Sequence, residues 1–375
     1  MFGLFGKKID TEKSARLQTR LGALIDPHNA QSFAQAGFIE RAQVLGDTAE
    51  IDCVLDYPFA GFEAELTAQI EALARQIEGV KQVKTTLAFV SPIGSSQSGK
   101  PLPGVRNIIA VASGKGGVGK STTSVNLALA LVAEGANVGL LDADIYGPSQ
   151  PLMLGCHETP RVDEHRAMQP IKAHGLQTMS IGYLIDEAQA MVWRGPMVTS
   201  ALMQLLNDTR WHDLDYLIVD MPPGTGDIQL TLAQKVPVAG SVIVTTPQDI
   251  ALLDARKAIT MFEKVNVPVL GIVENMATHI CSQCGHAEAI FGEGGAEKLA
   301  GEYHVDVLGR LPLDLTIRTD LDEGLPTVVR SPDSPITATY RQTARIMAAV
   351  LGRRVRTHVY DGPNIVVEEH GDASD

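Results

Sequence analysis

Residues 114–122 read GKGGVGKST, and the fold of the chain can be inferred outward from these nine residues. It follows the short apolar run NIIAVAS (107–113) and opens a helical pattern, KSTTSVNLALALVAE (120–134). Glycines here let the backbone curl so that amide N–H groups face a phosphate, and the start of the helix adds a favourable dipole. The stretch therefore predicts a phosphate-binding loop, with a merely glycine-rich turn as the alternative. The loop residues expected to face the nucleotide are Gly114, Lys115, Gly116, Gly117, Val118, Gly119, Lys120, Ser121 and Thr122.

The polar side chains of this loop have separate expected tasks. Lys120 would neutralise the β- and γ-phosphates of ATP, and Ser121 would hold Mg²⁺ through its hydroxyl. A self-contained site does not need the second lysine, Lys115. A cation that projects out of the loop could instead stabilise charge on the nucleotide of a neighbouring subunit.

Carboxylates stand at the ends of two further apolar runs. Asp220 ends LDYLIVD (214–220), where a magnesium-organising carboxylate would lie near the phosphate loop. Asp144, in LLDADIYGPS (140–149), could orient or deprotonate the attacking water. Asp227, in PPGTGDIQL (222–230), is expected in a switch that senses the γ-phosphate. The alternative for all three is an ordinary aspartate that caps the next element.

The rest of the chain shows the organisation around this loop. Apolar runs without alternation at 107–113, 137–144, 214–221, 240–246 and 267–275 alternate with helical stretches, which predicts a doubly wound, mostly parallel α/β sheet. Residues 1–92 contain shorter strand and helix patterns and are expected to form a small α+β domain. We expect a flexible linker over 93–104, the ATPase domain over 105–358 and an acidic tail over 359–375.

Composition limits the class of protein. A chain of 375 residues with 45% apolar and 20% charged residues is expected to be globular with about two domains. No apolar run is long enough to cross a bilayer and the start does not resemble a secretory signal, so the expected compartment is the cytoplasm. A net charge of −13 disfavours nucleic acid and anionic membranes as partners.

The four cysteines raise a separate question. Cys281 and Cys284 form the chain's single C-x-x-C, with His279 and His286 on either side. Four ligands within eight residues would be cramped around one tetrahedral metal. Two facing subunits would instead bring four thiolates together, enough for a cluster such as [4Fe-4S], while a bridging zinc or a redox dithiol stays open. The other two cysteines, Cys53 and Cys156, are expected to be small buried hydrophobic side chains.

Several motifs in order resemble one family. KGGVGKST (115–122), DADIYGPSQP (142–151), WRGPMVTSALMQ (193–204), DYLIVDMPPGTGD (215–227) and ENMA followed by CSQCGH (274–286) are similar to the Mrp/ApbC family of ATP-binding iron–sulfur cluster carriers. That family belongs to the deviant Walker-A ATPases, alongside MinD/ParA proteins. The first ~90 residues resemble the small MIP18-type domain that often precedes the carrier. They have YPFAGFE (57–63) where such domains often have a cysteine, which puts a thiol role there in doubt.

The resemblance implies roles for individual residues. Lys115 would reach across a dimer, Asp144 would lie in the first switch, Asp220 would be the Walker-B acid and Asp227 would lie in the second switch. Asn275 matches the position that reads the adenine edge, with a simple turn residue as the alternative.

The resemblance also implies an activity and partners. It favours an ATPase that carries a [4Fe-4S] cluster between Cys281 and Cys284 of two subunits, uses ATP and Mg²⁺, and exchanges the cluster with scaffold donors and recipient apoproteins. The rivals are a MinD/ParA-like positioning ATPase, which would need a basic amphipathic end or face, and a zinc-bridged P-loop ATPase.

Overall fold

The computed structural model describes residues 9–94, 100–164, 166–185, 195–281 and 283–360. Part of the expected linker (95–99), the start of WRGPMV (193–194), Ser282 and most of the expected acidic tail (361–375) lie outside the described residues. Within the described part, no helix is long and apolar enough to cross a membrane.

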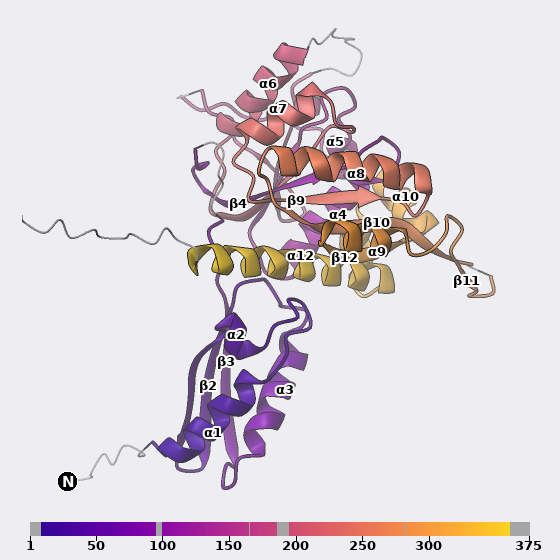
Figure 1. The fold of residues 1–375 in the computed structure, drawn as a ribbon. Coiled ribbons are helices and arrows are strands. Elements are labelled where there is room, and N and C mark those ends of the chain that lie inside the picture. The colour runs from indigo at the N-terminus through magenta and orange to yellow at the C-terminus, as the bar shows by residue number, and fades with distance from the viewer. Residues whose placement is uncertain (1–8, 95–99, 165, 186–194, 282, 361–375) are drawn as a thin grey trace, which may run out of the picture.

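The N-terminal domain is a small sheet backed by helices (Figure 1). Among the described residues it has three strands, of which β1 (Ile39–Leu45) runs antiparallel to β2 (Thr48–Leu55) and β3 (Gln82–Phe89) runs parallel to β2. Alternate residues of β2, such as Ile51 and Cys53, are fully buried under the helices. Those helices are α1 (Thr11–Gly22), the one-turn α2 (Phe33–Ala36) and α3 (Glu63–Arg75).

The rest of the chain forms one large sheet. In the described residues it has nine strands in the order β11-β10-β9-β4-β8-β5-β7-β6, with β12 also paired to β10. Only β6 and β11 pair antiparallel, which confirms the predicted mostly parallel sheet. The strands are β4 (Val105–Ala112), β5 (Val138–Asp142), β6 (Ile171–Ala173), β7 (Leu176–Ser180), β8 (Leu214–Asp220), β9 (Gly240–Thr245), β10 (Val269–Ile280), β11 (Ala287–Glu288) and β12 (Asp306–Leu313).

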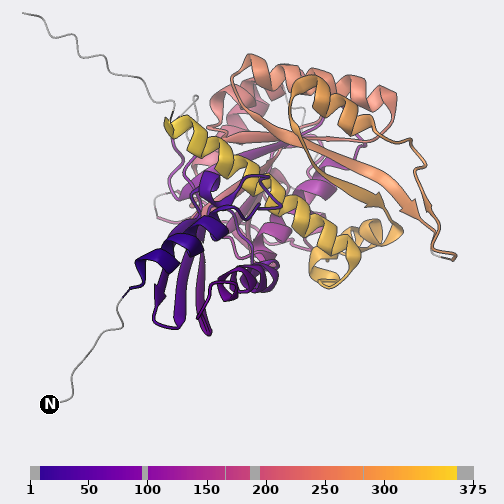
Figure 2. The same cartoon turned by 60° about the horizontal axis from the view of Figure 1, so that its bottom comes forward.

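Helices cover both faces of this sheet, as a doubly wound fold requires (Figure 2). One face packs on α4 (Lys120–Ala133) and α12 (Pro335–Tyr360), with α10 (Leu315–Asp322) and α11 (Thr327–Arg330) beside them. The other face packs on α6 (Gly195–Asn207), α7 (Asp227–Lys235), α8 (Asp249–Lys264) and α9 (Gly295–Tyr303). The strands in between carry near-continuous apolar runs because both of their faces are buried.

Two strand ends differ from the sequence prediction. β5 ends at Asp142, so Asp144 lies in the following loop rather than in the strand. β10 was expected to end at Asn275 but continues to Ile280, after a register shift against β12 between Glu274 and Thr278. The longer β10 carries the chain out to the cysteine pair.

The N-terminal domain rests on α4 and α12 (Figure 1). Glu134 follows α4 as its C-cap and is fully buried. Its carboxylate accepts hydrogen bonds from the Gly61 backbone N–H (2.7 Å), Arg341 Nε (2.7 Å) and Arg345 Nη1 (2.6 Å). Arg345 Nε also donates to His28 Nε2 (2.9 Å). A single buried carboxylate thus joins the end of the phosphate-loop helix, α12 and the N-terminal domain.

The densest basic stretch of the sequence, GRRVR (352–356), extends this contact. Arg353 Nη1 donates to the backbone carbonyl of Asn29 (2.9 Å), and Arg356 pairs with Asp56 and stacks over Phe38, 5.2 Å from the ring centroid. These arginines of α12 therefore hold the N-terminal domain.

Candidate nucleotide and cluster site

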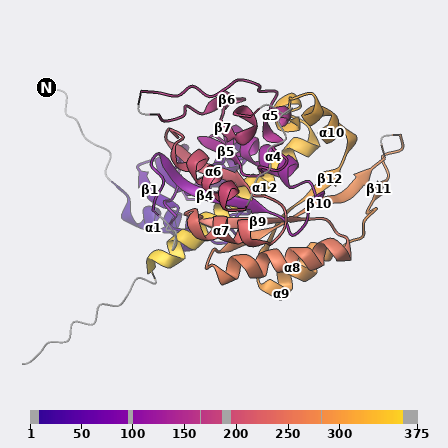
Figure 3. The ribbon, with the colours of Figure 1, turned by 90° about the horizontal axis from the view of Figure 1, so that it is seen from above.

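The predicted site residues come together because the central strands are parallel. The segments that follow β4, β5, β8 and β10 all leave the sheet at its carboxyl edge, which is where ligands bind in open α/β folds. The phosphate loop, Asp144, Asp220 and Asn275 therefore share this edge. Cys281 and Cys284 lie farther out on the hairpin of β10 and β11, which projects beyond the body of the sheet (Figure 3).

The phosphate loop is shaped by close packing around its glycines. A Cβ on Gly114 would lie 2.0 Å from the backbone oxygen of Asp254 in α8. A Cβ on Gly119 would lie 2.1 Å from Asn275 Nδ2, and Gly119 has a φ of 81°, in the left-handed region. Only glycine fits either position without displacing its neighbour, so these residues set the path of the loop into α4.

Lys120 is paired with the carboxylate that ends β8. It is almost fully buried, and its Nζ lies 2.6 Å from Asp220 Oδ1 and 3.2 Å from Ser121 Oγ. The same carboxylate oxygen accepts a hydrogen bond from Ser124 Oγ (2.7 Å). The structure thus brings together the expected phosphate lysine, the expected magnesium hydroxyl and the expected Walker-B carboxylate. Hydroxyl and carboxylate oxygens are the donors that Mg²⁺ prefers, so these residues fit that ion.

Sequence reasoning missed Asp142, which the structure places in the same cluster. Asp142 is paired in register with Asp220 on the adjacent strand, and its carboxylate accepts hydrogen bonds from the N–H groups of Asp144, Ser149 and Gln150. Burial, and next the charge of Asp220, raise the pKa of Asp142 to about 7. The sequence does contain a signal for Asp142. It lies two residues before Asp144, and residues two apart in an extended segment face the same side.

The remaining nucleotide-site residues lie around this cluster. Lys115 and Asp144 are half-buried, and burial is the main cause that raises the pKa of Asp144. Asp227 is exposed at the first position of α7, whose N-cap is Gly226. Asn275 is buried and donates from Nδ2 to the backbone carbonyl of Val118 (2.9 Å), so it braces the phosphate loop.

The cysteine pair lies at the tip of the β10–β11 hairpin. Cys281 N–H donates to the His286 carbonyl (2.9 Å), and Gly285 N–H donates to the Cys281 carbonyl (2.9 Å). Cys281 is half-buried and Cys284 is exposed. Backbone N–H groups, first that of Cys284, lower the pKa of Cys281, which favours the thiolate that metals and clusters bind.

The neighbouring residues of the hairpin and the other cysteines differ from this pair. His279 Nδ1 contacts the Leu313 carbonyl (3.1 Å), while His286 is exposed. Burial raises the pKa of Cys53 to about 12 and also raises the pKa of the half-buried Cys156. Both environments disfavour the thiolate.

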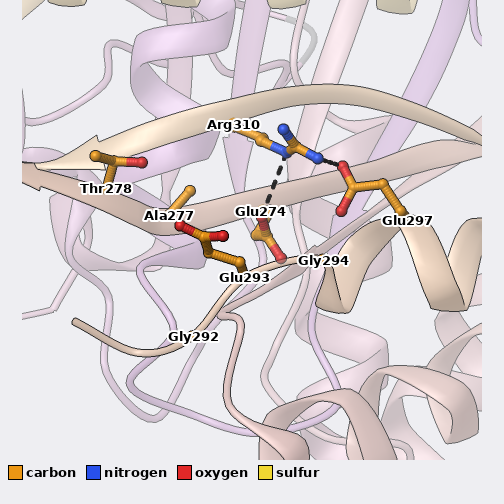
Figure 4. Close-up of a pocket in the computed structure, with 8 residues that line it drawn as sticks. All are labelled: Glu274, Ala277, Thr278, Gly292, Glu293, Gly294, Glu297 and Arg310. Atoms are coloured by element: carbon orange, nitrogen blue, oxygen red, sulfur yellow. Dashed lines mark ion pairs between the residues drawn. The ribbon is translucent and has the colours of Figure 1, made fainter. Parts of the chain in front are cut away.

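A cavity of about 480 Å³ lies between β10, β12 and the start of α9 (Figure 4). Glu274 in its wall is almost fully buried, accepts a hydrogen bond from Ala296 N–H (3.0 Å) and lies 3.6 Å from Arg310 Nε. Arg310 also pairs with Glu297 of α9. These contacts fix the middle of β10 at Glu274, directly before Asn275.

Comparison with known proteins agrees with the geometry. A family model described as NUBPL iron-transfer P-loop NTPase matches residues 104–348, and a second, described as iron-sulfur cluster assembly protein, matches residues 14–85. The iron-sulfur cluster carrier protein of Escherichia coli (strain K12) is 57% identical over 309 residues, 82% of this chain and 84% of that protein. The iron-sulfur cluster carrier protein of Haemophilus influenzae is 50% identical over 370 residues, 97% of each chain.

A solved structure gives the same result for the fold. The nucleotide-binding protein of Archaeoglobus fulgidus, in complex with ADP, has a TM-score of 0.54 and 37% identity, and the match covers 62% of this chain and 91% of that one. The resemblance noted in the sequence is confirmed. The chain belongs to the iron–sulfur cluster carrier family of P-loop NTPases, and its N-terminal domain belongs to the iron–sulfur cluster assembly family.

Proposed function

We propose that this protein is a nucleotide-gated carrier of a [4Fe-4S] cluster, which is its cargo. Two chains would hold the cluster between Cys281 and Cys284 of each, hydrolyse ATP with Mg²⁺, and pass the cluster from scaffold donors to recipient apoproteins. Residues 1–92 and 105–358 would act as two domains joined by the linker. The observation that carries the proposal is that β10 touches the phosphate loop through Asn275 and ends at Ile280, directly before Cys281.

This strand offers a direct mechanical route between nucleotide and cluster. Asn275 bonds to the Val118 carbonyl within the loop that would hold the phosphates. A change of the loop on nucleotide binding would therefore shift the strand six residues before Cys281. The strand would then have two arrangements, with and without bound ATP, that place the thiolates differently. ATP binding would therefore change the affinity of the thiolates for the cluster.

Exposed apolar side chains support pairing of two chains. Tyr146, Ile250, Ile280 and Leu315 follow or end strands at the carboxyl edge and are 53–69% exposed. Large apolar side chains that gather on one edge are typical of a contact surface. A second copy on this edge would place its own cysteine pair near the first, and would place Lys115 within reach of the partner's nucleotide.

Within each subunit we propose the following roles. Lys120 would neutralise the transferred phosphate, Ser121 and Asp220 would hold Mg²⁺, and Asp144 would orient or deprotonate the attacking water. Asp227 would sense the γ-phosphate from the start of α7, and Asn275 would lie at the adenine edge while bracing the loop.

Anaerobic reconstitution with iron and sulfide tests the cluster assignment. The Cys281→Ala and Cys284→Ala variants should lose the iron–sulfur absorption band and the bound iron and sulfide, because each change removes two of four thiolates in a dimer. Cys156→Ala is the matched control and should keep both. A Cys281→Ala protein with a full cluster, or a wild-type protein that binds only zinc, contradicts the proposal.

A further inference from the structure

Gln150 lies between three parts of the nucleotide site without belonging to the phosphate loop. It is the first residue of the four-residue helix α5 (Gln150–Met153), and its side chain is fully buried. Its amide Nε2 donates to Asp220 Oδ2 (3.1 Å) and to the backbone carbonyl of Ser121 (3.3 Å). Its backbone N–H donates to Asp142 Oδ2 (3.2 Å). Gln150 thus connects the carboxylates of Asp142 and Asp220 to the backbone at the start of α4.

These contacts fix the orientation of the Gln150 amide. Nε2 faces two oxygen atoms, one on Asp220 and one on Ser121, and both can only accept hydrogen bonds. Rotating the amide by half a turn would place its own oxygen against those acceptors. The hydrogen bonds therefore leave the other atom of the amide, Oε1, without a bond to either acceptor.

Oε1 of Gln150 is a buried acceptor that lacks a hydrogen-bond partner among the described residues. Leaving such an atom unpaired costs free energy, so it calls for a donor. Its amide is bonded to the carboxylate of Asp220 and to the carbonyl of Ser121, which are the two residues proposed to hold Mg²⁺. Magnesium in proteins keeps several of its waters, and each of these is a hydrogen-bond donor.

We propose that Gln150 is a positioning residue of the magnesium site: its Nε2 donates one hydrogen bond that orients the Asp220 carboxylate and one that holds the Ser121 carbonyl, and its free oxygen would accept a hydrogen bond from a water that the ion keeps. This inference rests on the proposed nucleotide function and deepens it. Partners of metal ligands of this kind typically contribute about 10- to 100-fold to metal affinity.

The test is the binding of a fluorescent ATP analogue, measured with Mg²⁺ and in EDTA. Gln150→Met keeps a similar side-chain length without either hydrogen-bonding atom, and Gln150→Leu is a second, more compact apolar variant. Gln177→Leu is the control, because among the described residues the Gln177 amide bonds only to the backbone of exposed His212, at the far end of β7. Thermal unfolding of all variants checks that they fold.

The proposal predicts a specific loss. In both Gln150 variants the Mg²⁺ concentration needed for half-maximal tight binding should rise about 10-fold or more, while affinity in EDTA stays within about twofold of the wild type. Equal losses with and without Mg²⁺ would mean a purely structural role and overturn the inference, as would an unchanged Mg²⁺ requirement. A wild-type protein whose nucleotide binding ignores Mg²⁺ would overturn the proposed function as well, which separates the two failures.

Discussion

At the scale of single residues, Lys120 is held by a carboxylate in this structure. Its Nζ contacts Asp220 Oδ1 at 2.6 Å, and both side chains are almost fully buried. A buried ion pair is costly to break from one side, because the remaining charge loses its partner. In the proposed function, nucleotide with Mg²⁺ would supply a new partner for each member, phosphate for the lysine and the cation for the aspartate. In the nucleotide-free protein, Lys120 and Asp220 therefore neutralise each other's charge.

Lys120→Ala should abolish ATP hydrolysis and also destabilise the fold by about 3–5 kcal/mol, because Asp220 is left buried and unpaired. The double variant Lys120→Ala with Asp220→Asn separates the two effects. It should regain much of the thermal stability and still hydrolyse no ATP. Lys257→Ala, which removes an exposed lysine of α8, is the control. Hydrolysis at the wild-type rate in Lys120→Ala would refute the assignment.

Asp142 should make the nucleotide-free protein lose stability as pH rises. Its pKa is raised to about 7 in the fold, so the folded chain binds more protons than the unfolded chain between the ordinary aspartate pKa of about 4 and that value. Ionisation of Asp142 therefore lowers the free energy of unfolding. Its stabilising contribution is fully present below about pH 4 and is lost as the pH rises through about 7. Other carboxylates also titrate there, so the useful quantity is the difference between Asp142→Asn and the wild type.

Calorimetry from about pH 5 to about pH 8 measures that difference. The melting temperature of Asp142→Asn relative to wild type should rise with pH, by about 2–4 °C for each kcal/mol of ionisation cost removed. The asparagine loses acceptor bonds at every pH, so only the trend is diagnostic. A difference that is flat, or that falls as pH rises, contradicts the shifted pKa.

At the scale of elements, α4 connects the site to the N-terminal domain. The helix starts at Lys120 and is capped by Glu134, which holds Gly61, Arg341 and Arg345 together. Glu134→Gln should keep the side-chain shape but remove the charge that faces two guanidinium groups. The N-terminal domain should then detach more often.

Hydrogen exchange and limited proteolysis measure this release. In Glu134→Gln the amide of Gly61 should exchange faster, and the segment 91–104 should be cut sooner, because the contact that holds the domain is weakened. Glu263→Gln on the exposed face of α8 is the matched control. Exchange and cleavage equal to the wild type would show that the domain is held elsewhere.

The elements also show what the sequence could predict. The central strands β4, β5, β8 and β9 follow from continuous apolar runs, since both faces are buried. The extension of β10 to Ile280 could not be predicted, because Thr278 and His279 are polar and are held in the sheet by β11 and β12, distant in sequence. The sequence of β1 shows no clear strand pattern, because its mixed polar residues acquire a buried face only beside β2 and α1.

Some residues of the candidate site could be predicted from the sequence, and others only from the structure. The phosphate loop and Asp220 are local motifs next to strong strand patterns, so the sequence located them. The roles of Gln150 and Glu134 come from contacts that join segments 29 to more than 200 residues apart. Gln150 does stand in the motif DADIYGPSQP, but the residues around either position do not show these contacts. Long-range contacts of this kind are set by the packing of finished elements.

At the scale of the whole molecule, the carboxyl edge of the sheet carries the residues proposed for both functions, nucleotide binding and cluster binding. The phosphate loop, the two aspartates and the cysteine hairpin lie along it, and exposed apolar side chains such as Ile280 and Leu315 accompany them. One chain offers two thiols on this hairpin, whereas a [4Fe-4S] cluster takes four. A symmetric pair of chains meets that number through a single self-complementary surface.

Native mass spectrometry of the anaerobically reconstituted wild-type protein, combined with iron and sulfide assays, tests this claim most directly. We predict a dimer that carries four iron and four sulfide ions in total, while chains that separate as monomers retain no complete cluster. A monomer that holds one complete four-iron cluster, or a dimer that holds two, would contradict it.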